Sequence, residues 1–255
     1  MTDSYNIVIP ARIGSSRFPG KPLHRINGHP MLAHVVQRAR ESAADQVIVA
    51  TDDEKILQCC EDIGVDAMMT DAAHVSGTDR IAEVAEKLRW NSDTIIVGLQ
   101  GDEPATEPAH LDRLAQNLRG SSIASMATFC VPVSSENDLK NPDRVKVVMD
   151  CDNLALYFSR APIPYARDKQ GLSHLAAYVH VGLYAYRCGF LHKFSKTPPA
   201  ALEVLEQLEQ LRVLANGGRI HVDVLEKAHA AGVDRMEDVE AVAKLLRERF
   251  QQPGA

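Results

Sequence analysis

Three cationic side chains lie close together near the start of the chain, in a stretch rich in glycine and proline. Arg12, Arg17 and Lys21 fall within Pro10–Leu23, and no Asp or Glu occurs from Ser4 to Arg40, although the whole chain carries a formal charge of −6. Backbone N–H groups of a glycine-containing turn and fixed cations together bind phosphate oxygens. The stretch therefore predicts a site for a small polyanion rather than for nucleic acid. A polar loop with solvated cations is the alternative.

A second group of residues that could bind a ligand is Leu99–Pro104, with the sequence Leu-Gln-Gly-Asp-Glu-Pro. Asp102 follows an apolar run and a glycine, a position that places a carboxylate at the carboxyl edge of a parallel sheet. Mg²⁺ is commonly held at such a place by one or two carboxylates together with substrate phosphates. Asp102 is therefore a candidate metal ligand, and an aspartate that only orders a turn is the alternative.

The stretch His74–Arg80 combines the features of a helix start with those of an anion site. Ser76 and Asp79 have the spacing of an N-cap and a third helical residue, which gives both a structural explanation. Capping does not explain His74 or Arg80. Because a helix N-terminus is also a favourable anion site, capping and ligand binding are compatible here.

Strand and helix patterns alternate through the first half of the chain and must position these residues. Short apolar runs predict buried strands, and apolar residues at helical spacing predict helices between them. This alternation predicts a mostly parallel sheet covered on both faces, with ligands at the carboxyl ends of its strands. The predicted strands are Tyr5–Pro10, Gln46–Thr51, Val65–Thr70 and Thr94–Leu99, and the predicted helices are Met31–Ser42, Glu54–Ile63, one around Ile81–Leu88, and Leu111–Leu118.

The second half mixes hairpin, strand and helix patterns. Tyr178–Arg187 predicts a strand with one apolar face and one face of aromatic and imidazole groups. That second face suits a polar ligand such as a sugar, or a subunit interface. Asp234 is a candidate cap of the last helix. The other predicted elements are a strand at Ser122–Val133, a hairpin of Val145–Met149 and Leu154–Phe158, a helix at Leu202–Ala215, a strand at Arg219–Val224 and a helix at Met236–Phe250.

Length and composition set further limits. The 255 residues suffice for one large α/β domain with room for a subdomain. No apolar run approaches the roughly 18 residues of a membrane span, and no basic region followed by an apolar one opens the sequence. The five cysteines show neither a C-x-x-C pair nor a His/Cys metal pattern. They predict reduced thiols in a cytoplasmic protein.

These motifs, in this order, resemble those of the 3-deoxy-manno-octulosonate (Kdo) cytidylyltransferases. The resemblance runs from Ile7 to about Arg247 and includes His-Val-Gly-Leu-Tyr-Ala-Tyr-Arg from His180. It implies a single cytidylyltransferase domain over residues 1–255: a three-layer α/β sandwich of nucleotide-diphospho-sugar transferase type, with a mostly parallel mixed sheet and a small dimerisation subdomain at about 145–186. The implied reaction converts CTP and Kdo to CMP-Kdo and pyrophosphate for lipopolysaccharide biosynthesis. It implies Mg²⁺ as cofactor and a homodimer without membrane insertion.

The resemblance also assigns roles to residues of this sequence. It implies that Arg12, Lys21, Asp102 and Asp234 act in catalysis, the two aspartates as metal ligands. It implies nucleotide contacts for Ala11, Arg12, Ser15, Arg17, Lys21, Ser76, Arg80 and Gln100. It implies sugar contacts for Gln100, Arg160, His180, Tyr184, Glu209 and Gln210. The family motif ends in Leu-Glu-Gln-Leu-Arg, which selects Glu209 and Gln210 over Glu206 and Gln207. Val179 departs from the family, which usually has a basic residue there.

Two other functions are compatible with the sequence. One is a cytidylyltransferase for a different sugar acid, such as sialic acid or amino-Kdo. The other is a catalytically silent nucleotide-binding protein, against which the presence of both Asp102 and Asp234 argues. A panel of sugar acids separates the first alternative, and CTP binding without turnover would identify the second.

Overall fold

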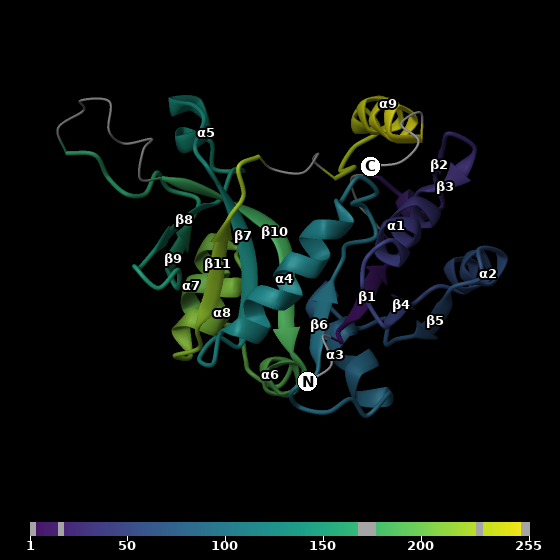
Figure 1. Cartoon of the computed structure of the whole chain (residues 1–255), viewed down its shortest axis with the longest axis horizontal. Helices are drawn as coiled ribbons and strands as arrows, with labels where there is room; N and C mark the ends of the chain where they lie inside the picture. Colours follow the sequence, from purple (N-terminus) through teal and green to yellow (C-terminus); the bar gives the residue numbers. More distant parts are fainter. Residues whose placement is uncertain (1–3, 15–17, 168–176, 228–231, 251–255) are drawn as a thin grey trace.

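A central sheet organises the computed structural model, which describes residues 4–14, 18–167, 177–227 and 232–250. Its main strands lie in the order β11-β7-β10-β6-β1-β4-β5 (Figure 1). Their bounds are β1 Asn6–Ala11, β4 Gln46–Thr51, β5 Asp66–Met69, β6 Ile95–Gly98, β7 Met126–Pro132, β10 Tyr178–Arg187 and β11 Ile220–Val224.

The sheet is mixed but mostly parallel, as the sequence predicts. β1 pairs in parallel with β4 on one side and β6 on the other, and β11 pairs in parallel with β7. β10 pairs antiparallel with both β6 and β7, so among these strands it is the reversed one. Every residue of β1 is buried, and alternate side chains point into the cores on opposite faces of the sheet.

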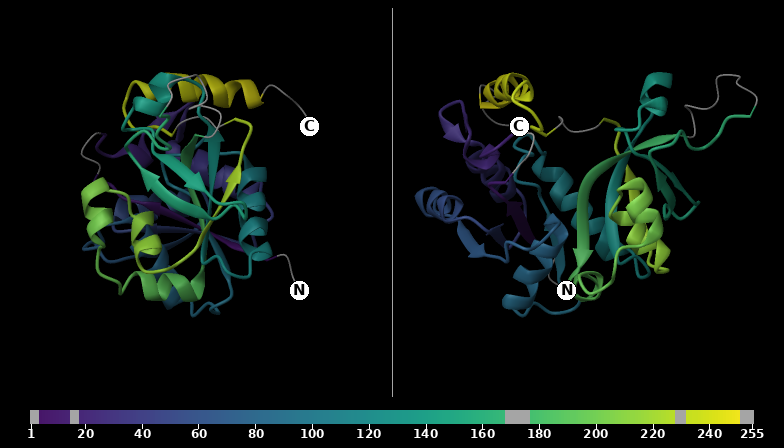
Figure 2. Two further views of the ribbon diagram at one scale, coloured as in Figure 1. Left: turned by 90° about the vertical axis from the view of Figure 1, so that its left-hand side faces the viewer. Right: turned by 180° about the vertical axis from the view of Figure 1, so that it is seen from behind.

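Helices cover both faces of the sheet (Figures 1 and 2). Apolar side chains of α1 (Met31–Arg40), α2 (Glu54–Asp62) and α4 (Pro108–Gly120) pack into one core, and those of α3 (Gly77–Lys87) and α6 (Cys188–Phe194) into the other. The three-layer α/β fold is therefore confirmed. Within the described residues, none of the helices has the length and hydropathy needed to span a membrane.

The predicted hairpin is present and extends the sheet through β10. β8 (Lys146–Met149) pairs antiparallel with β9 (Ala155–Ser159) and also with the first residues of β10. The dimerisation role expected of this region stays a prediction. Two short helices lie outside the sequence prediction: α6 and α5 (Glu136–Lys140). Ser135 caps α5 by accepting a hydrogen bond from the Asp138 N–H.

The predicted helix Leu202–Ala215 is wrong as a continuous element. The segment forms two short helices, α7 (Ala201–Glu206) and α8 (Gln210–Ala215), separated at Gln207, which has a φ of 52°. The leucines of the segment differ accordingly: Leu205 is 80% exposed, whereas Leu211 is fully buried. A left-handed residue ends a helix, so the second half turns to face the sheet.

The chain segment before the last helix returns to the start of the molecule. The helix α9 (Asp238–Phe250) packs near a small hairpin of β2 (Arg25–Ile26) and β3 (His29–Pro30), which follows the short 3₁₀ helix η1 (Lys21–Leu23). The carboxylate of Asp238, the first residue of α9, accepts from the N–H groups of Asp234 and Arg235, which precede the helix. The capping role considered for Asp234 stays a prediction.

Candidate active site

A cavity of about 340 Å³ opens beside the carboxyl ends of β1 and β6 and the start of α3. Parallel strands place the residues that follow them at one edge of the sheet, which brings distant parts of the chain together there. The predicted site residues that line this cavity are Ala11, Arg12, Lys21, Ser76, Arg80, Gln100, Asp102, Glu209 and Asp234. Ser15 and Arg17 lie outside the described residues.

Small residues allow the walls of the cavity to approach one another. A Cβ atom added at Gly101 would lie 3.0 Å from the Pro10 carbonyl oxygen, and one at Gly77 would lie 3.2 Å from the Pro10 side chain. The Gly101 N–H also donates to the Pro10 carbonyl over 3.3 Å. The turn after β6 and the first turn of α3 thus lie directly against the end of β1, which fixes Gln100 and Asp102 beside Ala11 and Arg12.

Lys21 lies between the two predicted metal carboxylates. Its Nζ is 2.5 Å from Asp102 Oδ2 and 3.7 Å from Asp234 Oδ1. The lysine is 8% exposed, so its charge acts in a partly desolvated setting. Asp102 and Asp234, which are 132 residues apart in the sequence, are therefore both brought to one cation.

This donor set fits a hard divalent cation that shares its coordination with a substrate. Two carboxylates converge on one point, and among the described residues no group of three or more His, Cys, Asp or Glu side chains forms a closed metal site. Mg²⁺ is typically held by one or two carboxylates, with phosphate and water oxygens as its other ligands.

Ser76 and Arg80 lie in the cavity wall with defined partners. Ser76 caps α3, accepting from the Asp79 N–H over 3.1 Å, and its hydroxyl lies 3.4 Å from Glu209 Oε1. Arg80 is 3% exposed. Its guanidinium donates to the Asp52 carboxylate, and Nη1 donates to Thr70 Oγ1 over 2.8 Å. Arg80 is thus held rigidly in the wall, a constraint that only the tertiary structure reveals.

Glu103 is an acidic group beside the two aspartates whose role the sequence leaves open. Burial, together with the neighbouring Asp102 charge, raises the pKa of its carboxyl to about 8, although a hydrogen bond from Thr106 opposes the shift. Like charges close together favour protonation of one of them. Glu103 therefore adds little negative charge to this part of the cavity near neutral pH.

Four of the predicted sugar residues line this cavity or a smaller one next to it: Gln100, Tyr184, Glu209 and Gln210. Glu209 lines both the large cavity and a small apolar one of about 20 Å³, which Tyr184 and Gln210 also line. The His180 ring lies 5.2 Å from the Tyr184 ring and 5.1 Å from that of Phe158. Burial raises the pKa of Glu209 and raises that of Tyr184 well above 10. Both shifts disfavour the charged form of these side chains, and both side chains carry oxygens that can hydrogen-bond to hydroxyl groups.

His180 is a neutral imidazole with an assigned tautomer. Its Nε2 is 3.0 Å from Thr128 Oγ1, and that hydroxyl lies within 2.9 Å of the carbonyl oxygens of Val181 and Leu183. Because the hydroxyl proton goes to a carbonyl, Oγ1 accepts from Nε2–H, and Nδ1 is left as an acceptor. Burial lowers the pKa of His180 to about 3.

Arg160 is not brought to the cavity. Its guanidinium donates to backbone carbonyls, from Nε to Glu206 over 2.7 Å and from Nη1 to Pro142 over 2.9 Å. The Glu206 carboxylate in turn accepts from Ser159 Oγ and from the Arg160 N–H. Arg160 and Glu206 thus bind the turn between α7 and α8 to the end of β9. This turn precedes Glu209, which lines the cavity.

A buried ion pair stabilises the same corner from the other side. Arg212 donates from Nε and Nη2 to the two Glu203 carboxylate oxygens, over 2.8 and 2.5 Å. Its guanidinium also lies over the Phe194 ring, 4.5 Å from the centroid. This bidentate pair joins α7 to α8 across the left-handed Gln207.

His74 lines the cavity although it was not among the predicted site residues. It belongs to the stretch His74–Arg80, and capping of the helix does not explain its presence there. Its Nε2 lies 2.6 Å from Glu83 Oε2, and the same oxygen accepts from the Asp71 N–H over 2.9 Å. Lys87 Nζ binds the other Glu83 oxygen over 2.6 Å. Sequence spacing could not show that Glu83, one helical turn beyond Arg80, holds this histidine.

Comparisons with known proteins agree with this geometry. The sequence profile of the cytidylyltransferase family matches residues 6–230. The chain is 48% identical to a 3-deoxy-manno-octulosonate cytidylyltransferase of Thioalkalivibrio sulfidiphilus, covering 96% of this chain and 99% of the relative. It is 49% identical to the enzyme of the same name from Pseudomonas syringae pv. tomato, again covering 96% and 99%.

One solved structure gives the same assignment, and a more distant one shares the fold. A structure of CMP:2-keto-3-deoxy-manno-octonic acid synthetase complexed with CTP superposes with a TM-score of 0.89 at 41% identity, covering 96% of this chain and 99% of that one. A 4-diphosphocytidyl-2C-methyl-D-erythritol synthase shares the fold, with a TM-score of 0.62 at 16% identity and coverage of 95% and 98%. The chain therefore belongs to the cytidylyltransferase family and, within it, to the 3-deoxy-manno-octulosonate cytidylyltransferases.

Proposed function

We propose that the protein transfers CMP from CTP to Kdo, giving CMP-Kdo and pyrophosphate. The observation that carries this proposal is the single cavity in which Arg12 and Lys21 meet Asp102 and Asp234. Its relatives over almost the whole chain are named for this activity. The sugar hydroxyl forms the new bond to the α-phosphorus of CTP, and the bond to the pyrophosphate oxygen breaks.

The residues of the cavity perform this transfer by positioning and charge. Lys21 neutralises phosphate oxygens next to the carboxylates, and the chain needs no covalent nucleophile because such transfers depend on orientation and charge stabilisation. Asp102 and Asp234 are the residues that would hold Mg²⁺. When bound, the ion would neutralise phosphate charge and favour ionisation of the attacking hydroxyl. We assign a sugar hydroxyl as the partner of His180, whose neutral ring has Nδ1 as its acceptor.

Pyrophosphate release tests the proposal directly. The assay combines Mg²⁺ and CTP with and without Kdo, and repeats the measurement with ATP, GTP and UTP and with sialic acid and amino-Kdo. Release that requires both CTP and Kdo is expected. Release with another sugar acid would overturn the sugar assignment, and CTP binding without release in any combination would identify a silent nucleotide-binding protein.

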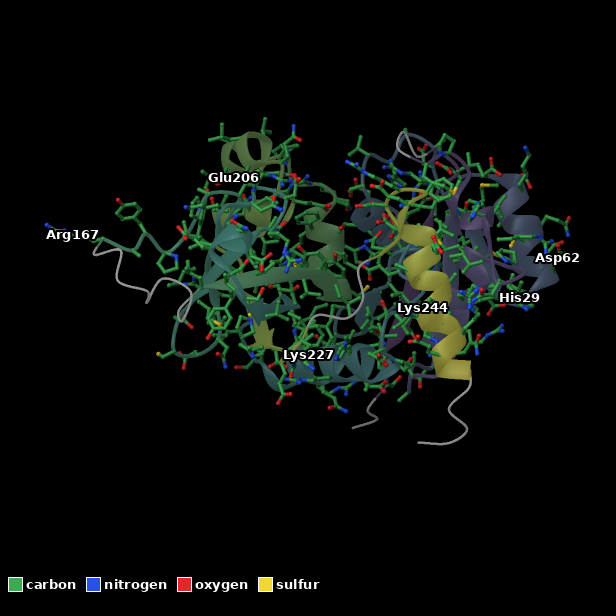
Figure 3. The ribbon with its side chains drawn as sticks, turned by 90° about the horizontal axis from the view of Figure 1, so that it is seen from above. His29, Asp62, Arg167, Glu206, Lys227 and Lys244 are labelled. Atoms are coloured by element: carbon green, nitrogen blue, oxygen red, sulfur yellow. The ribbon has the colours of Figure 1, made fainter. Side chains whose placement is uncertain are left out.

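A pair of variants connects the activity to the cavity. Asp102→Asn keeps the shape of the side chain but removes its charge, and it should reduce turnover by about 100-fold or more. Asp62→Asn is the matched control, because Asp62 lies at the end of α2, outside the residues that line the cavity (Figure 3). CTP binding without metal should change little in either variant. Near-normal turnover of Asp102→Asn would contradict the assigned role.

We further propose that the active form is a homodimer. Support comes from large apolar side chains left exposed in and near the β8–β9 region: Leu156 is 60% exposed, Tyr165 82% and Val204 64%. Apolar side chains clustered at a surface are typical of subunit contacts. Light scattering of the chain and of a Leu156→Glu variant tests this. A monomeric mass of the unaltered chain at working concentration would refute it.

A further inference from the structure

The chain around Asp234 and α9 packs against residues 18–31 through a small apolar cluster. Phe18, Ile26, Met31 and Val233 are buried together with three residues of α9, and this α9 cluster comprises Phe18, Ile26, Met31, Val233, Val242, Ala243 and Leu246. It is separate from the two cores that flank the sheet. Phe18 precedes Lys21 by three residues, and Val233 directly precedes Asp234. The two partners of the Lys21–Asp234 ion pair therefore rest on one shared cluster.

Polar contacts fix α9 to the same region. Asn27 Nδ2 donates to the Ala243 carbonyl over 2.9 Å, and Arg247 Nη1 donates to Asn27 Oδ1 over 2.8 Å. Asn27 is in the left-handed region, with a φ of 50°, at the tip of the β2–β3 hairpin. Figures 1 and 3 show α9, which carries Lys244, beside the part of the chain that carries this hairpin and His29.

Two backbone contacts carry the position of α9 to the metal carboxylates. The Val233 N–H donates to the Asp102 carbonyl over 2.8 Å. A Cβ atom added at Gly232 would lie only 2.9 Å from that same carbonyl oxygen. The backbone before Asp234 can therefore approach Asp102 this closely only because residue 232 is a glycine. Asp238 then fixes the Asp234 N–H from the other side, over 2.9 Å.

We propose that α9 is a positioning element of the active site, which holds Asp234 opposite Asp102 through the α9 cluster. This inference rests on the proposed function for the identity of the reaction, but not for its geometry. Among the side chains that the structure describes, none from α9 lines the cavity. Its effect is instead to restrict where the Asp234 carboxylate lies relative to Lys21 and Asp102, as supporting residues do for metal ligands.

A comparison of two leucine variants isolates this effect from general loss of stability. Leu246→Ala removes a side chain that is 1% exposed from the α9 cluster, and Leu118→Ala removes a fully buried one from a main core, on α4. Both changes leave a cavity and lower the melting temperature. Leu246→Met conserves volume and serves as the rescue variant. Neither leucine lines the active-site cavity.

The readout is the binding of Mn²⁺, as a paramagnetic substitute for Mg²⁺, to the full-length protein saturated with CTP. Electron paramagnetic resonance of free Mn²⁺ gives its dissociation constant. We expect Leu246→Ala to weaken Mn²⁺ binding by about 10-fold, Leu118→Ala to leave it unchanged and Leu246→Met to restore it. Turnover should follow Mn²⁺ occupancy, with a similar KM for CTP.

Equal weakening in both alanine variants, or no weakening in Leu246→Ala, would overturn the proposal. If Leu246→Ala does not fold, Asp238→Ala replaces it, because it removes the acceptor of the Asp234 N–H without opening a cavity; unchanged Mn²⁺ binding in that folded variant would equally overturn it. The Mn²⁺ measurement needs no sugar. Failure of Kdo-dependent pyrophosphate release in the unaltered chain would therefore reject the proposed function while the role of α9 is still decided.

Discussion

The buried imidazole of His180 should make the folded protein lose stability in mild acid. Its pKa falls from the ordinary 6.5 to about 3 because burial disfavours the charged ring. As the pH drops below 6.5, the unfolded chain binds a proton at this position and the folded chain does not. The contribution of His180 to the free energy of unfolding therefore decreases with falling pH from about 6.5 down to about 3.

The size of the effect follows from those two pKa values. pH 5 lies about 1.5 units below the pKa of the unfolded imidazole. Each such unit changes the free energy of unfolding by about 1.4 kcal/mol. His180 should thus reduce the free energy of unfolding by about 2 kcal/mol between about pH 8 and about pH 5. The hydrogen bond from Nε2–H to Thr128 persists throughout this range, because it requires only the neutral ring.

Urea unfolding of the unaltered chain and of His180→Gln at both pH values measures this contribution. Glutamine cannot titrate, and its amide can still donate toward Thr128. Other titrating groups, such as His34 and His221, whose pKa values burial also lowers, act equally in both proteins and cancel. The unaltered chain should lose about 2 kcal/mol more than the variant on acidification. An equal loss in both, or an NMR titration of the His180 ring above pH 5, would refute this reasoning.

Three further outcomes follow from single contacts. Lys21→Met should lower turnover by about 100-fold and weaken CTP binding, as measured by steady-state kinetics and calorimetry; unchanged kinetics would contradict its place between the carboxylates. Arg212→Met should destabilise the fold by about 3 kcal/mol in urea, because it leaves Glu203 unpaired, whereas a double variant with Glu203→Leu should recover most of that loss; equal stability of single and double variants would rule out the coupling. Gly101→Ala should force the turn away from the Pro10 carbonyl. This should lower the free energy of unfolding by about 1–3 kcal/mol and raise the KM for CTP. Normal values for both would show that the turn can shift freely.

Sequence patterns predicted the features that depend on neighbouring residues. The alternation of apolar strands and helices gave the sheet, and Ser76 caps α3 as its spacing indicates. The residues at the ends of β1 and β6 meet in one cavity because parallel strands end at the same edge. Sequence patterns therefore predicted a residue's position correctly where that position depends on a single helix or strand.

Features that depend on distant partners could not be predicted in the same way. The repeat Leu-Glu-Gln-Leu-Glu-Gln has a continuous helical pattern, yet Gln207 breaks it because Glu206 is bound by Ser159 and Arg160, about 46 residues away. Arg160 is likewise committed to backbone carbonyls instead of the cavity. The close approach of Gly232 to the Asp102 carbonyl and the bond from the Asp234 N–H to Asp238 likewise join parts of the chain that no local pattern connects.

The contacts that dock α9 also determine when an active site can first exist during synthesis. Asn27 bonds to Ala243 and Arg247, which are 216 and 220 residues further along the chain. Ribosomes extend a chain at about 5–20 residues per second, so roughly 10–40 s separate the two halves of this contact. A nascent chain therefore carries Lys21 and Asp102 well before Asp234 has been made. With the proposed roles of Asp234 and α9, a complete active site requires the contact between Asn27 and Ala243, which closes a loop of 216 residues.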